Sequence, residues 1–366
     1  MANNKIFVAA TSQHVGKTTS TLGLMSGLRS HGLNVGYCKP VGQEFIDIGT
    51  TRVDKDAFLF ASSNGFELVP ELHSPVILGS GATQAYLDNP SAFNFSNKIL
   101  KASKILQAQY DVVVYEGTGH PGVGSVVDLS NARVAELLGA GLIMVVEAGI
   151  GNTIDLLDLN LSVFEAKNIP ILGVIINKAI PGKIDKVQHY VGNVLKERGI
   201  NLLGIMPYEQ ELGLPVMHSI VKAINGKVEF NEDQLDNRVT DIVAGSLIDL
   251  SDSQDFTNQL LVVSINRLDE ALKKMENVWK LLDCEDYPLS GIIVTGPGEF
   301  MEHHKEVFEK HRIPVVRAAI DTYEVVIKIS RIEVKINTRT PWKVSKAIHL
   351  FQEHVDLGPV LKFLDQ

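Results

Sequence analysis

The sequence predicts an α/β protein in which a doubly wound parallel sheet is followed by a second, smaller α/β domain. Residues 1–210 alternate short, unbroken Val/Ile/Leu runs with longer helical patterns, as in parallel sheets that are buried on both faces. A shorter series of the same kind begins at about residue 241. The chain has 366 residues, more than one hydrophobic core usually serves, so two domains are expected.

The first series gives the strands and helices of the larger domain. The strand candidates are "KIFVAA", "NVGYCKP", "DVVVYEG", "LIMVVEA", "PILGVIINK" and "NLLGIMP". Helical spacing with a closing glycine marks segments between them, such as "STLGLMSGLRSHG" and "NARVAELLGAG". Alternation of this kind predicts right-handed crossovers, with ligands bound outside the carboxyl ends of the strands.

The second half of the chain is expected to contain a linker, a domain and a tail. Residues 211–240 are more polar and weakly periodic, which favours a connection. Residues 241–350 contain the strand candidates "QLLVVSI", "LSGIIVTG" and "IPVVRAAI", separated by helical patterns. The last ~25 residues resemble a terminal helix with a tail, and residues 351–366 are assigned to this C-terminal tail.

Composition narrows the class of protein. The net charge is −9, and no Lys/Arg run follows the pattern of a nucleic-acid-binding surface, so no nucleic acid partner is expected. Cys38 and Cys284 are too few for a disulfide framework, which favours a reducing compartment. No signal-peptide pattern and no apolar run of membrane-spanning length is found. The sequence therefore predicts a cytoplasmic protein without a membrane partner.

A phosphate-binding loop is predicted between the first strand and the first helix. Gly16, Lys17 and Thr18 stand where the loop enters the helix, followed by Thr19. In such loops backbone N–H groups point at a phosphate, the lysine reaches its oxygens and a hydroxyl binds Mg²⁺. The opening glycine is missing, since its position is held by Ala10 or Thr11 depending on loop length. The alternative is an ordinary helix start with an exposed lysine.

Charged residues follow three further segments. Lys39 ends the second strand candidate, where a plain surface lysine is the alternative. Glu116 ends a buried strand and could bind Mg²⁺, while Gly117 after it lets backbone approach a ligand. Asp54 and Asp56 precede a helical pattern, where either could bind the metal or cap the helix.

These pieces, in this order, resemble the dethiobiotin synthetase family of phosphate-loop ATPases. The matching motifs are Val15-Gly16-Lys17-Thr18, Lys39-Pro40-Val41, Glu116-Gly117-Thr118-Gly119, Asn177 after "GVII", and Leu202-Leu203-Gly204-Ile205-Met206-Pro207. The resemblance covers about residues 1–210 and implies that ATP and Mg²⁺ are the cofactors.

The resemblance also implies a role for each residue that matches. Lys17 and Lys39 would be catalytic, by holding the phosphates and by neutralising the transferring phosphoryl group. The metal would be bound by Thr18, Asp54 or Asp56, and Glu116. The nucleotide would be bound by Val15, Gly16, Lys17, Thr18, Thr19, Gly117, Asn177 and Pro207.

The region from about residue 241 resembles the DRTGG domain, which follows a dethiobiotin-synthetase-like domain in the front half of some phosphotransacetylases. The signs are "IVAGSL", "LLVVSINRLDEAL", "SGIIVTG" and "IPVVRAAIDTYEVVIKI". The motif that names the domain has changed, because "SINRLD", with Arg267 and Asp269, stands in its place.

Two functions follow from these resemblances. The substrate side departs from the synthetases at Gly42-Gln43-Glu44, where an acid would repel a substrate carboxylate, and at His120, which is either a ligand contact or a hydrogen-bonded loop residue. We therefore expect a nucleotide-dependent regulatory or sensory protein linked to acyl-phosphate and CoA metabolism. The alternative is an ATP-dependent ligase, of the cyclo-ligase or cobyrinic acid diamide synthase kind, acting on a small carboxylate. An unidentified small molecule is the expected partner, and a homodimer is expected by analogy.

Overall fold

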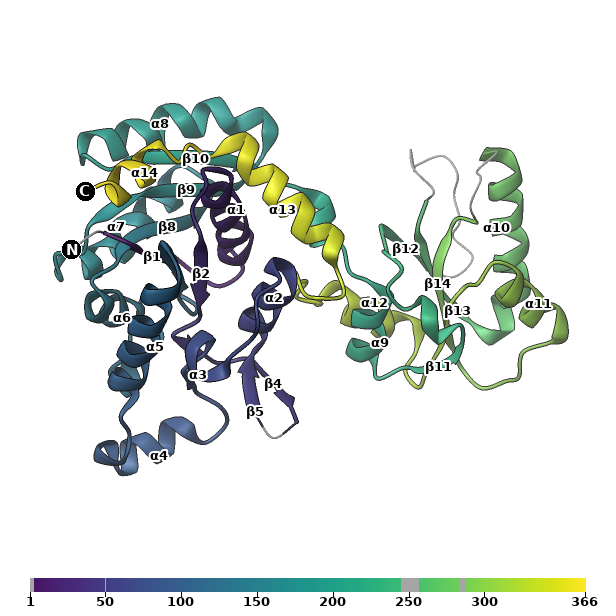
Figure 1. Ribbon diagram of the computed structural model, residues 1–366. Helices are drawn as coiled ribbons and strands as arrows, with labels where there is room; N and C mark the ends of the chain where they lie inside the picture. Colours follow the sequence, from purple (N-terminus) through teal and green to yellow (C-terminus); the bar gives the residue numbers. More distant parts are fainter. Residues whose placement is uncertain (1–2, 50, 245–256, 283–286) are drawn as a thin grey trace. The chain divides into compact units, whose positions relative to one another are not determined.

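A computed structural model describes residues 3–49, 51–244, 257–282 and 287–366. The chain forms two compact units (Figure 1). The first comprises Met1–Glu209 together with Ile336–Gln366, and the second comprises Gln210–Lys335. The second unit is therefore inserted into the first.

The first unit is built on a six-stranded parallel sheet in the order β10-β9-β8-β1-β7-β2. Its central strands are almost wholly buried, as expected of apolar runs that helices cover on both faces. The strands are β1 (Lys5–Ala10), β2 (Val35–Cys38), β7 (Val112–Glu116), β8 (Gly141–Glu147), β9 (Ile171–Ala179) and β10 (Leu202–Pro207). This arrangement confirms the doubly wound sheet predicted from the sequence.

The helices of the first unit alternate with these strands. They include α1 (Lys17–Ser30), α5 (Phe95–Gln109), α6 (Asn131–Leu138), α7 (Gly151–Glu165) and α8 (Ile184–Glu197). Since β1 lies between β7 and β8, and β2 follows β7, the order of strands reverses around β1. The loop after β1 therefore starts at the switch point, where doubly wound sheets bind ligands.

An excursion between β2 and β7 carries further residues of the predicted site. It contains the parallel pair β3 (Val41–Gly42) and β6 (Val76–Ile77), and the hairpin of β4 (Phe45–Ile48) and β5 (Thr51–Asp54). Its helices are α2 (Lys55–Asn64), α3 (Pro70–His73) and α4 (Ala82–Asp88). Since α2 starts directly after β5, Asp54 and Asp56 stand at a helix N-terminus.

The second unit has its own five-stranded sheet in the order β11-β15-β14-β13-β12, which is parallel except for β11 at one edge. Its strands are β11 (Lys227–Phe230), β12 (Asp241–Ala244), β13 (Gln259–Ser264), β14 (Leu289–Thr295) and β15 (Val315–Ala318). Its helices are α9 (Met217–Ile224), α10 (Leu268–Leu282), α11 (Glu302–Lys310) and α12 (Thr322–Ser330). Apolar clusters fill both faces of the sheet. This confirms a second, smaller α/β domain.

The expected linker at 211–240 is wrong, because this segment belongs to the second unit. Helix α9 buries Met217, Ile220 and Ile224 in that unit's core, and β11 pairs with β15. Helix α9 is only eight residues long, so its apolar face repeats over only about two turns of the sequence, and the strand after it is half exposed.

The expected tail at 351–366, and the end of the second domain at 350, are also wrong. Residues 336–366 return to the first unit, where α13 (Pro341–His354) lies along α1 and is followed by α14 (Gly358–Leu364) (Figure 1). The helices approach closely, since a Cβ added at Gly23 of α1 would lie 2.1 Å from the Phe351 side chain. After α13, Val355 forms a bridge to Gly204 on β10, which covers that edge of the sheet.

Two smaller expectations concern membranes and cysteines. Within the described residues, no helix is both long and apolar enough to cross a bilayer. Cys38 is a buried free thiol on β2, and Cys284 lies outside the described residues.

Candidate functional site

The loop after β1 delivers the predicted phosphate-binding residues to the start of α1. The backbone turns through left-handed conformations at His14 (φ 60°) and Gly16 (φ 97°) before the helix begins at Lys17. In the described structure no side chain caps this helix, and its first turn contains no acidic residue. The first-turn N–H groups and the positive end of the helix dipole therefore suit an anion.

Lys17 and Thr18 both point to the end of β7. The Lys17 ammonium donates to the carbonyl oxygen of Gly119 at 3.0 Å, and the Thr18 hydroxyl donates to Glu116 Oε1 at 3.1 Å. The contacts span about a hundred positions of sequence, because β1 and β7 are neighbouring parallel strands. The structure thus brings together the lysine, the hydroxyl and the carboxylate that the motifs predicted.

Lys39 is not a surface lysine. Its side chain is only 5% exposed, and its ammonium lies 2.5 Å from Asp56 Oδ2 and 3.2 Å from Glu116 Oε1. Burial alone would lower the pKa of Lys39, but the charges of Asp56, Glu116 and Asp54 outweigh it and raise that pKa. Lys39 therefore remains a cation, held between carboxyl groups from α2 and β7.

Glu116 is fully buried at the end of β7. Burial raises the pKa of its carboxyl group, against the opposing effect of Lys39. Its Oε1 accepts from Thr18 and Lys39, while its Oε2 is buried without a hydrogen-bond partner among the described residues. A buried carboxylate oxygen that lacks a partner is rare, and a bound cation is one way to satisfy it.

Asp54 and Asp56 separate into two roles. Asp54 caps α2, since its Oδ1 accepts from the backbone N–H of Asp56 at 2.8 Å and of Ala57 at 3.4 Å. Burial raises the pKa of Asp54 to about 7, although Lys39 opposes the rise. Asp56 instead pairs with Lys39. In the described structure, the oxygens of Asp54, Asp56 and Glu116 do not all lie within 4.8 Å of one another, so the three carboxyl groups do not converge on one position. Lys39 lies between them instead.

Two residues predicted to bind the nucleotide lie on β9 and β10. On β9, Asn177 donates from its side chain to the carbonyl oxygen of Val15 at 2.8 Å. A Cβ at Gly16 would lie 1.9 Å from Asn177 Nδ2, so only glycine fits there. Pro207 ends β10 opposite Ala179 of β9. Asn177 thus fixes the shape of the loop, and Pro207 stands one strand further from it.

The turn after Glu116 is organised by Asn131, which sequence reasoning did not select. The Asn131 side chain accepts from Thr118 N–H at 3.0 Å and donates to the carbonyl oxygens of Thr118 and His120, both at 2.8 Å. Gly117 leaves room for it, because a Cβ there would lie 2.8 Å from Asn131 Oδ1. His120 is a hydrogen-bonded loop residue, whose Nδ1 accepts from Gly122 N–H at 3.2 Å. Only the position of Asn131 at the start of a helix pattern hinted at this role.

The donors at this edge of the sheet fit Mg²⁺, which prefers hydroxyl, carboxylate and water oxygens. Thr18 and Glu116 offer such oxygens side by side, and Glu116 Oε2 is the buried oxygen without a partner. A divalent ion bound here would neutralise phosphate charge. The chain itself contributes the fixed cations Lys17 and Lys39 and the N-terminus of α1.

Two family models match the chain in succession. One, for the AAA domain, matches residues 4–216, which is more than half of the chain. The chain belongs to the AAA domain family. Behind it, a DRTGG domain matches residues 219–332. This AAA protein therefore has the domain order that the sequence motifs implied, a dethiobiotin-synthetase-like phosphate-loop domain followed by a DRTGG domain.

Named relatives share parts of this AAA protein. Phosphate acetyltransferase from Nitratidesulfovibrio vulgaris is 24% identical over 374 residues, covering 97% of this chain and 51% of that enzyme. A probable cobyric acid synthase from Methanocaldococcus jannaschii is 29% identical over 239 residues, covering 57% of this chain and 46% of that protein. The chain spans about half the length of these curated relatives.

Among solved structures, the MinD cell division protein of Aquifex aeolicus is 16% identical, with a TM-score of 0.35 over 57% of this chain and 84% of that chain. A similarity of this size carries no argument about function.

Proposed function

We propose that this AAA protein binds ATP with Mg²⁺ and acts as a nucleotide-dependent regulator or sensor in acyl-phosphate and CoA metabolism. The observation that carries the proposal is the assembly at the carboxyl ends of β1, β2 and β7. There the uncapped N-terminus of α1, Lys17, Thr18 and the buried Lys39–Glu116 pair converge. Such a set of positive charge and oxygen donors matches a triphosphate with its metal.

In this proposal each site residue has a defined task. Lys17 holds the β- and γ-phosphates, and the loop from Val15 to Thr19 offers backbone N–H groups to the same phosphates. Thr18 and Glu116 hold Mg²⁺, with Asp54 or Asp56 as a further carboxylate. Gly117 keeps the neighbouring turn close to the nucleotide, and Asn177 and Pro207 frame the adenine.

The link to acyl-phosphate metabolism is supported by the relatives named phosphate acetyltransferase, which match 97% of this chain. A regulatory role is favoured by the DRTGG domain and by the substrate side of the site. Gln43 and Glu44 are exposed beyond β3, and Glu44 pairs with Lys55 of α2 at 3.2 Å. An exposed carboxylate there disfavours an anionic substrate.

A ligase is the second candidate, and Lys39 is the observation that favours it. A buried ammonium between carboxylates from α2 and the end of β7 is costly, and such groups are frequent in active sites. In a ligase, Lys39 would neutralise charge on the transferring phosphoryl group. The relative named probable cobyric acid synthase supports the same class.

Calorimetric titration with ATP and Mg²⁺ tests the proposal on wild type, Lys17→Ala and, as a control, Lys55→Ala, with phosphate release followed in the same samples. We expect ATP binding in wild type and Lys55→Ala, at least about tenfold weaker binding in Lys17→Ala, and little phosphate release. Release that rises when a small carboxylate or diamine is added would favour the ligase. Absence of binding in wild type would refute both. A homodimer is part of the proposal, and light scattering of the same samples gives its mass.

A further inference from the structure

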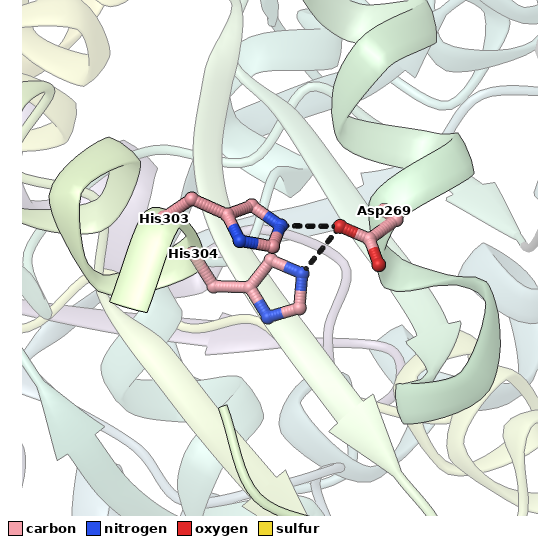
Figure 2. Close-up of side chains that lie close together, drawn as sticks. All are labelled: Asp269, His303 and His304. Carbon is pink, nitrogen blue, oxygen red and sulfur yellow. Dashed lines mark hydrogen bonds and ion pairs between the residues drawn. The ribbon is translucent and has the colours of Figure 1, made fainter. Parts of the chain in front are cut away.

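The second unit contains a cluster of two histidines and one aspartate that the proposed nucleotide site does not use. Asp269 lies in the first turn of α10, and His303 and His304 lie in the first turn of α11 (Figure 2). In the described residues, each of the three offers one ligand atom, and these atoms lie within 4.8 Å of one another. We propose that Asp269, His303 and His304 form a binding site for a divalent transition metal of the zinc type.

The geometry supports this assignment because both imidazoles point at one oxygen. Nε2 of His303 lies 2.5 Å and Nε2 of His304 lies 2.8 Å from Asp269 Oδ1 (Figure 2). Ligand atoms about 2.0 Å from a tetrahedral zinc ion are about 3.3 Å apart. Both distances to Asp269 Oδ1 must therefore lengthen, and small outward movements of the half-exposed His303 and Asp269 side chains open enough room for the ion.

The donor set also selects the class of metal. Imidazole nitrogen suits Zn²⁺, Ni²⁺, Cu²⁺ and Fe²⁺, whereas Mg²⁺ and Ca²⁺ prefer oxygen. Two histidines with one carboxylate are a known zinc set in sites that keep a position for water or another ligand. The two proposed metal sites thus differ in chemistry, with oxygen donors in the first unit and mainly nitrogen donors in the second.

His304 is buried, which fixes the direction in which its Nε2 points. Its side chain is 3% exposed and lies against the rings of Phe300 and Phe308. Its Nδ1 accepts from the backbone N–H of Met301 at 3.2 Å, so the ring proton is on Nε2, facing Asp269. A metal bound to Nε2 would move that proton to Nδ1, and Nδ1 could then no longer accept the hydrogen bond from the Met301 N–H. Metal binding therefore leaves a signature on the His304 ring that a simple hydrogen-bonded clamp does not.

The experiment is a calorimetric titration of the full chain with Zn²⁺, after a chelator has removed bound metal. Excess Mg²⁺ is present so that the carboxylates of the first unit do not compete for Zn²⁺. We compare wild type with His303→Gln and Asp269→Asn. The matched control is His349→Gln, since His349 is an exposed histidine whose Nε2 lies 3.2 Å from the single carboxylate of Glu353. We expect one saturable site, an affinity at least about tenfold lower in the first two variants, and no change in the control.

A second measurement follows the His304 ring by ¹⁵N NMR, so that the buried residue need not be replaced. We expect its proton on Nε2 without metal and on Nδ1 with Zn²⁺. Absence of saturable binding, equal affinity in all variants, or a His304 proton that stays on Nε2 would each overturn the proposal. Equal thermal stability of metal-free wild type and His303→Gln checks that the variant is folded.

Discussion

Replacing Lys39 with methionine removes the cation that joins the carboxyl groups of the nucleotide site. Breaking a buried ion pair from one side usually costs about 3–5 kcal/mol of unfolding free energy, because the other charge stays buried. Glu116 is wholly buried, but the Asp56 side chain is 29% exposed and can be partly solvated. We therefore expect Lys39→Met to lower the free energy of unfolding by about 3 kcal/mol.

The unfolding free energy lost in Lys39→Met should become smaller as the pH falls. The raised pKa of Lys39 keeps it charged throughout the range of about pH 5–8, so its own titration contributes nothing there. Once Lys39 is removed, the largest effect that opposes burial at Glu116 and Asp54 is lost, and the pKa values of both carboxyl groups rise further. The folded variant then takes up protons as pH falls, while the unfolded chain does not until its ordinary carboxyl pKa is reached. The penalty should therefore shrink from about pH 8 to about pH 5.

Urea unfolding measures the loss when it is read from the first unit alone. The chain has two tryptophans, Trp342 in α13 of the first unit and Trp279 in α10 of the second. A Trp279→Phe background therefore leaves Trp342 as the reporter. Lys55→Met is the matched control, since its ion pair with Glu44 is about half exposed on both sides and should contribute less than about 1 kcal/mol. A Lys39→Met penalty no larger than that of the control, or one that does not shrink at low pH, would refute the reasoning.

Three further predictions concern the loop, the metal and the returning helix. Gly16→Ala should abolish ATP binding in calorimetry, because the added Cβ would lie 1.9 Å from the Asn177 side chain. The control is Gly32→Ala, which is also at positive φ but has open space around it and should bind ATP as wild type does. Equal binding in both variants would contradict this. Mg²⁺ binding should release protons, increasingly so as the pH falls, because burial raises the pKa of Glu116 and the ion binds its ionised form. The heat of Mg²⁺ binding should therefore depend on the ionisation enthalpy of the buffer, and an unchanged heat would count against Glu116 as ligand. Phe351→Ala should lower the unfolding free energy of the first unit by about 3–5 kcal/mol in urea titrations, because Phe351 is only 1% exposed. A loss below about 1 kcal/mol would show that the packing of α13 adds little to the stability of this unit.

The elements that the sequence predicted well were those with a strong local signal. The buried strands appear as unbroken apolar runs, and the motifs at their ends reach one edge because parallel strands share a direction. Helix α9 was missed because it is short, and the contact of α13 with α1 was missed because an apolar helix face indicates burial but not the partner. The same limit applied within the site. The Asn131 contacts and the Lys39–Asp56 pair depend on how loops distant in sequence meet, and no local pattern encodes this.

The insertion of the second unit has a practical consequence for anyone who wishes to produce the nucleotide-binding part alone. A fragment that stops at residue 216, where the AAA domain match ends, lacks α13 and α14. It exposes to water the surface of α1 around Gly23 that Phe351 covers, and it leaves the edge of β10 without Val355. Such a fragment should aggregate, because both an apolar surface and an open sheet edge invite association. We expect the minimal soluble fragment to be residues 3–209 joined by a short flexible linker to residues 336–366, so that α13 and α14 remain with the helix and the strand edge that they cover.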